Sequence, residues 1–147
     1  MESGMKAWVL ALIGTVGGYC AALFGGWDAS LQTLLIFMVI DYVMGLAVAG
    51  VFHKSQKTET GTLSSKECFE GLARKGAALL IVLVGAQLDR VSGIDYVRDG
   101  VCIAFIANET ISIIENAGLM GVPIPDVLTK AIELLKKQSD QMEGEGQ

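Results

Sequence analysis

A small set of polar side chains stands inside segments that are otherwise apolar. Asp41 interrupts one uncharged run, and the second half of a later run contains a group of five polar residues: Asn108, Glu109, Ser112, Glu115 and Asn116. At 100° per residue, these five fall on a helical stripe about 120° wide. Carboxyl groups in apolar surroundings need a partner, water or a proton. The six residues are therefore the candidate polar face, which either lines a pore or joins subunits.

The rest of the sequence offers no catalytic constellation. It has no GxSxG, HExxH or Walker motif, so we predict no enzyme activity, no catalytic residues and no cofactor. Cys20, Cys68 and Cys102 lack CxxC spacing and nearby histidines, which predicts reduced packing residues and no metal site. The net charge of −5 argues against a nucleic-acid partner.

Composition indicates that lipid is the solvent for most of the chain. Hydrophobic residues make up 52% of the sequence, charged residues 18%, and the charges are confined to a few windows. A membrane-spanning helix needs about 20 mostly apolar residues. The sequence predicts an all-α integral membrane protein with four transmembrane helices, at about residues 7–24, 31–52, 72–92 and 97–120. The first is interpreted as a retained span, since no A-x-A cleavage pattern follows it.

The second apolar run is expected to insert into the membrane despite Asp41. Insertion of the third and fourth runs depends on what surrounds their charged residues. Asp41 costs roughly 2.5–3.5 kcal/mol at mid-depth. The twelve Leu, Ile, Val or Phe residues around it each contribute about −0.3 to −0.6 kcal/mol. Gly45, one turn further on, leaves room for a neighbouring helix. The third run has an apolar core only at 76–88, so its charged flanks are expected to snorkel outward: Arg74, Lys75, Asp89 and Arg90.

The fourth run is marginal. Eight Leu, Ile, Val or Phe residues in 100–119 supply about −2.4 to −4.8 kcal/mol, whereas two ionised glutamates cost about 5–7 kcal/mol. This helix should cross only against protein or water, or with protonated carboxyls. The alternative is that it lies on the membrane surface.

Small residues recur at helical spacing in the first run, at Gly14, Gly18 and Ala22. Such ridges let helices approach closely in lipid. The sequence leaves open whether they pack within one subunit or form a self-association face.

The chain divides into a membrane domain, residues 1–121, and a cytoplasmic segment, residues 122–147. Pro123 and Pro125 end the fourth run, and residues 126–137 have the pattern of an amphipathic helix. The tail after Ser139 is expected to be disordered. With both termini inside, nine Lys or Arg residues lie inside and only Arg90 and Arg98 outside, which the positive-inside rule favours.

Several segments resemble the phage holin and toxin-secretion holin family, which includes clostridial toxin-release proteins. The similar features run from about residue 25 to 130. They are Gly26-Trp27-Asp28; Asp41-x-x-x-Gly45; Ser64-Ser65 before Gly71-Leu72-x-Arg74-Lys75; Asn108-Glu109-x-x-Ser112-Ile113-x-Glu115-Asn116; and Gly121-Val122-Pro123-Ile124-Pro125.

The resemblance implies a multi-pass protein of the bacterial cytoplasmic membrane. Its partners would be the lipid bilayer and further copies of itself, and it would form lesions that release an endolysin or a toxin. Two alternatives stay open. One is a small four-span exporter, which would be expected to carry an acid in its first span. The other is an antiholin-type regulator of holin assembly, which sequence does not separate from a holin.

Overall fold

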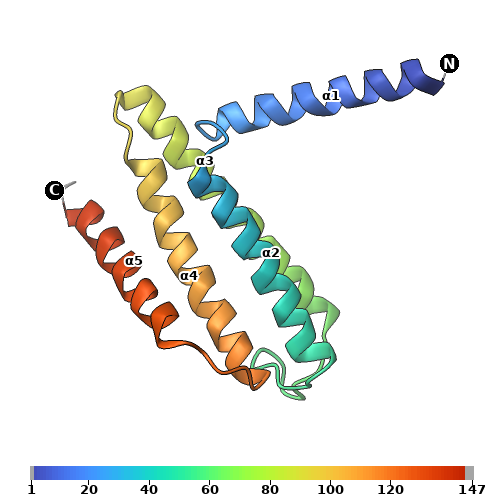
Figure 1. Cartoon of the computed structure of the whole chain (residues 1–147), viewed down its shortest axis with the longest axis vertical. Helices are drawn as coiled ribbons and strands as arrows, with labels where there is room; N and C mark the ends of the chain where they lie inside the picture. Colours follow the sequence, from blue (N-terminus) through green and yellow to red (C-terminus); the bar gives the residue numbers. More distant parts are fainter. Residues whose placement is uncertain (1, 145–147) are drawn as a thin grey trace.

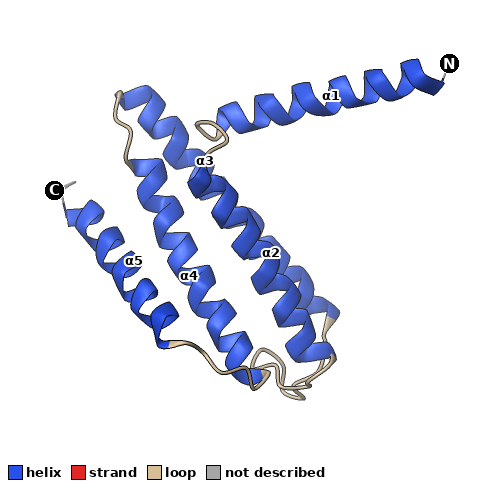
Figure 2. Ribbon diagram, in the orientation of Figure 1, coloured by secondary structure: helices blue, strands red, loops and turns tan. Residues whose placement is uncertain are grey.

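Five helices account for most of the chain. The structure, a computed structural model, describes residues 2–144 and contains no strand within them. The helices are α1 (Glu2–Leu23), α2 (Ala29–Gly50), α3 (Ser65–Ser92), α4 (Val97–Leu119) and α5 (Asp126–Gly144). Figure 2 shows the same path with its connecting loops. The all-helical prediction is confirmed.

Helices α2, α3 and α4 form an up-and-down bundle, and α5 runs back along α4 (Figure 1). The loop at residues 51–64 and the linker at 120–125 lie at one end of the bundle. The turns at residues 24–28 and 93–96 lie at the other end. Helix α1 leaves that second end at a steep angle and makes its few helix contacts with α3.

The helix ends follow local chemistry. Gly25 and Gly26 have φ of +84° and +112°, which ends α1 because few other residues adopt that backbone. The Asp28 carboxylate then accepts from the Leu31 amide at 3.0 Å and begins α2. Asp89 accepts from the amides of Val97 and Arg98, which caps α4. The predicted outward snorkelling of Asp89 is therefore wrong.

The bundle core is small and apolar. It is built from Leu31, Leu34 and Met38 of α2, Val82 of α3, and Cys102 and Ile106 of α4. The outer faces stay apolar too, with large exposed side chains at Val39 and Val43 of α2 and at Leu80, Ile81 and Val84 of α3. A soluble monomer rarely exposes such continuous apolar surface, whereas lipid accepts it.

Three of the four predicted spans are long and apolar enough to cross a membrane: Ser3–Leu23, Ala29–Gly50 and Ser65–Ser92. The fourth, α4, forms a helix at the predicted place, but among the described residues it does not belong to this group. The segment expected to be disordered after Ser139 is helical as far as Gly144. Residues 145–147 lie outside the described residues.

Candidate functional site: a polar network between three helices

Lys75 of α3 is the centre of the site. Its ammonium Nζ donates to Asp41 Oδ2 of α2 at 2.8 Å and to Glu109 Oε2 of α4 at 2.5 Å. The side chains of Lys75, Asp41 and Glu109 are only 14%, 12% and 8% exposed. One cation therefore joins all three bundle helices through buried ion pairs. The predicted outward snorkelling of Lys75 is wrong.

Asn116 completes the network from the same helix as Glu109. Its amide Nδ2 donates to Asp41 Oδ1 at 2.9 Å, so each Asp41 oxygen has its own donor. Gly45 lies beside this contact, since a Cβ built there would be 3.9 Å from Asn116 Nδ2. At the next residue of α2, the Tyr42 hydroxyl donates to the Cys68 carbonyl at 3.4 Å.

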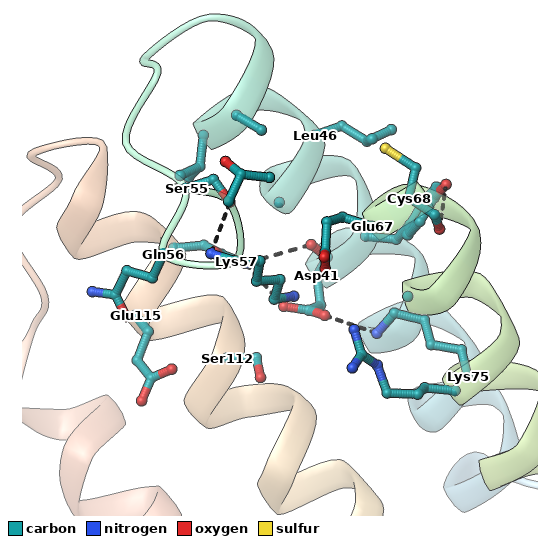
Figure 3. A pocket seen from close by; sticks show the side chains of 18 of the residues that line it. Asp41, Leu46, Ser55, Gln56, Lys57, Glu67, Cys68, Lys75, Ser112 and Glu115 are labelled. Carbon is teal, nitrogen blue, oxygen red and sulfur yellow. Dashed lines mark hydrogen bonds and ion pairs between the residues drawn. The ribbon is translucent and has the colours of Figure 1, made fainter. Parts of the chain in front are cut away.

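A cavity of about 370 Å³ opens beside the network, between α2, α3, α4 and the loop at residues 51–64. All six candidate polar residues line it: Asp41, Asn108, Glu109, Ser112, Glu115 and Asn116. Figure 3 shows Lys75 directed at Asp41, with Ser112 and Glu115 on the α4 side. The predicted stripe and the acid of the second run thus meet in one place.

The stripe is not uniform in its surroundings. Glu109 is buried and Asn116 half-buried, both in the network, whereas Asn108 and Glu115 are exposed and Ser112 is half-buried. Sequence reasoning missed Lys75 as their partner. Two acids inside apolar runs, facing a third run that begins with a lysine, were the available signal.

The charges of the network do not balance. Two buried carboxylates face one buried ammonium, in surroundings where separated charges interact strongly. Removing the Lys75 ammonium would leave both carboxylates uncompensated, which costs more than the intact pairs contribute. The network can therefore hold α2, α3 and α4 together.

The candidate helix-packing residues of α1 lie away from the Lys75 network. No atom beyond the helix's own backbone and chain neighbours lies within 4 Å of a Cβ built at Gly14 or Gly18, and Ala22 is exposed. These three residues do not pack against the bundle of the same chain.

A second ionic cluster stands at the opposite end of the bundle, around the buried Arg98. The guanidinium contacts both Asp28 oxygens and the Asp99 carboxylate, and Nη2 donates to the Gly26 carbonyl at 3.4 Å. Its hydrogen bonds hold the pKa of Asp28 below the ordinary 3.8. This cluster ties the turn between α1 and α2 to the start of α4.

Comparison with known proteins gives a consistent picture. The model of a bacteriophage holin family matches residues 18–137. An uncharacterised protein of Listeria innocua is 38% identical over 144 residues, which cover 97% of this chain and 94% of the relative. A probable holin of Bacillus phage phi105 is 30% identical over 112 residues, which cover 76% of this chain and 77% of that protein. No solved structure matches the chain.

Proposed function

Since the chain belongs to the bacteriophage holin family, we propose that it assembles as a homo-oligomer in the bacterial cytoplasmic membrane and permeabilises it. The released cargo is a cytoplasmic endolysin or a protein toxin, which need not bind the chain. The observation that carries this mechanism is the Lys75 network, because it pairs Asp41 and Glu109 within one chain.

The network supports a resting state that does not permeabilise. With Lys75 between Asp41 and Glu109, these three charged side chains turn inward, and the apolar outer faces of α2 and α3 meet lipid. Such a chain can accumulate without opening a path for water. Pairing also lowers the cost of placing α4, the weakest span, inside the membrane.

During assembly, water or a neighbouring chain replaces the contacts between Lys75 and the two acids. The cavity beside the network already brings together Asn108, Ser112 and Glu115 with the paired acids. When several chains meet, water or a neighbouring chain replaces the contacts of Lys75, and the polar face of α4 turns toward the water-filled lesion. Asp41, Glu109 and Glu115 set the balance between the two arrangements.

The proposed placement has four spans with both termini in the cytoplasm. The loop at residues 51–64 and α5 then lie inside, as the basic residues favour. Helix α1 is the first of these spans, and its crossing requires its angle to the bundle to change at Gly25 and Gly26. Its small residues Gly14, Gly18 and Ala22, which are free of contacts with the bundle, pack against another copy.

Dye release from liposomes tests the proposal. Wild-type chain should release a trapped dye, and Glu109→Leu combined with Glu115→Leu should abolish release at equal membrane abundance, since it makes α4 a stable lipid-facing helix. Wild-type release from the double variant would remove the polar face from the mechanism. A wild-type chain that inserts but releases nothing would contradict the holin role and favour the antiholin or exporter alternatives.

A further inference from the structure

Helix α5 leaves most of the described side chains of its apolar stripe uncovered. The stripe comprises Val127, Leu128, Ala131, Ile132, Leu134 and Leu135. Against α4, Ile132 is only 8% exposed, whereas Val127 is 76% and Leu134 67% exposed. Helix α5 therefore contacts α4 along one edge of its stripe and presents the other edge to its surroundings.

Lys130 and Lys137 flank the open edge, with the exposed acids Asp126 and Glu133 next to them. At 100° per residue, Val127 and Leu134 lie about 20° apart on the helix, while Ile132 lies about 140° from Val127. Lys130 and Lys137, both exposed, lie about 40° and 60° from Leu134 on the side away from Ile132. An apolar edge bordered by lysines is typical of a helix at the bilayer interface, where the lysine stems reach up to the headgroups.

The position of α5 makes the bilayer the fitting partner. Helix α5 follows the linker at residues 120–125 and starts at the same bundle end as the basic loop. In the proposed arrangement α4 crosses the membrane, and α5 beside it would hold Lys130, Glu133 and Lys137 at bilayer depth. That placement is strongly disfavoured for charged side chains. The linker, with Pro123 and Pro125, lets α5 turn away into the membrane plane.

We propose that α5 binds the surface of the bilayer through its open edge, with Val127 and Leu134 inserted among the lipid acyl chains. The inference rests on the proposed function, because it takes α4 as a span. The contact with α4 through Ile132 and the contact with lipid are then alternatives. Helix α5 covers α4 before insertion and anchors the bundle end to the membrane surface afterwards.

Environment-sensitive labels test this directly in the full chain. In a cysteine-free background, Val127→Cys, Leu134→Cys and the control Thr129→Cys, which lies on the opposite side of α5, each carry a nitrobenzoxadiazole (NBD) probe. In vesicles of phosphatidylcholine with phosphatidylglycerol, iodide should quench the probes at 127 and 134 about threefold less than the probe at 129. Equal quenching at all three sites would overturn the proposal.

A second measurement keeps the native cysteines. In the same vesicles, trypsin should cut after Lys130 and Lys137 several-fold faster in Leu134→Asp than in Thr129→Asp, because only the first change releases α5 from lipid. Equal cleavage rates would contradict the surface contact. Protected probes without dye release would reject the holin role and leave the surface contact standing, and dye release with unprotected probes would do the opposite.

Discussion

Lys75 and Glu109 lie 34 residues apart in sequence and are joined at 2.5 Å between Nζ and Oε2. Lys75 begins the apolar part of α3, and Glu109 lies halfway along α4, the one predicted span that is not among the three described helices long and apolar enough to cross a membrane. The pair therefore links the placement of α4 to the position of α3. Changes to either residue should affect both folding and permeabilisation.

Lys75→Met should destabilise the chain by about 3–5 kcal/mol, because Asp41 and Glu109 lose their buried cation. The measurement is denaturant unfolding in detergent micelles. The matched control is Lys66→Met, which breaks the pair between Lys66 and Glu70 on the same helix. The Lys66 side chain is 81% exposed, so this loss should stay below about 1 kcal/mol.

Neutralising Asp41 and Glu109 as well should restore the stability of the Lys75→Met variant. Combined with Asp41→Asn and Glu109→Gln, the methionine variant has no uncompensated buried charge, and replacing a whole buried ionic cluster is often close to neutral. We expect recovery of most of the lost stability in the same unfolding assay. A triple variant as unstable as Lys75→Met alone would show that the methionine fails through packing and that charge is not the cause.

Glu109→Gln and Glu115→Gln should differ, although they lie on one stripe. Glu109 is buried against Lys75, whereas Glu115 is exposed at the cavity. Removing the Glu109 charge weakens the tie between α3 and α4, so dye release should begin earlier at equal insertion. Glu115→Gln should change the onset much less. Equal effects of the two variants would indicate that the contact of Glu109 with Lys75 does not control the onset of release.

Gly85→Ala should destabilise the bundle, in contrast to Gly76→Ala on the same helix. A Cβ at Gly85 would lie 3.1 Å from the Arg98 Cα and 3.3 Å from its amide nitrogen, which are backbone atoms with little freedom. At Gly76 no atom lies within 4 Å of the added Cβ, so alanine should stabilise α3 by up to about 1 kcal/mol. The two melting temperatures in detergent should therefore shift in opposite directions.

The free energy of unfolding should decrease at low pH, partly because Asp28 becomes protonated. Its pKa is lowered in the folded state because Arg98 donates to the carboxylate. The contribution is therefore complete at pH values above the ordinary 3.8 and is lost as the pH drops through the lowered value. Melting curves from pH 6 down to pH 2.5 should show a smaller acid loss for Asp28→Asn than for wild type. Identical pH profiles would remove Asp28 from this effect.

Membrane orientation is tested with single cysteines in a cysteine-free chain. Lys54 lies in the basic loop and Ser92 at the opposite end of the bundle, and both are exposed. A membrane-impermeant maleimide added to intact cells should label Ser92→Cys and leave Lys54→Cys unlabelled. The reverse pattern would invert the proposed topology.

The helices could be located from the sequence because their limits depend on local chemistry. The predicted limits of α2 and α4 lie within two residues of the observed ones, and α1 ends at Leu23, one residue before the predicted limit of the first run. The extension of α5 to Gly144 was missed. The acidic, glycine-containing tail resembles a disordered segment, yet Gln, Met and Glu are good helix formers.

The contacts inside the site are made between helices, and the residue pattern of one helix does not predict them. The stripe on α4 identified Glu109 and Asn116, and the acid in an apolar run identified Asp41. The direction of Lys75 could not be derived in the same way. A lysine at the edge of a span can reach outward to the headgroups or inward to a carboxylate, and the choice depends on how α2 and α4 pack around it.

The tie at the turn between α1 and α2 also bears on the order of synthesis. Arg98 follows Asp28 by 70 residues. Both helices flanking the turn therefore leave the ribosome before Arg98 is available to pair with Asp28. Until α4 has been synthesised, the Arg98 contacts with Gly26 and Asp28 that hold this turn are missing. In a nascent chain stalled before Arg98, the turn between α1 and α2 would lack these contacts.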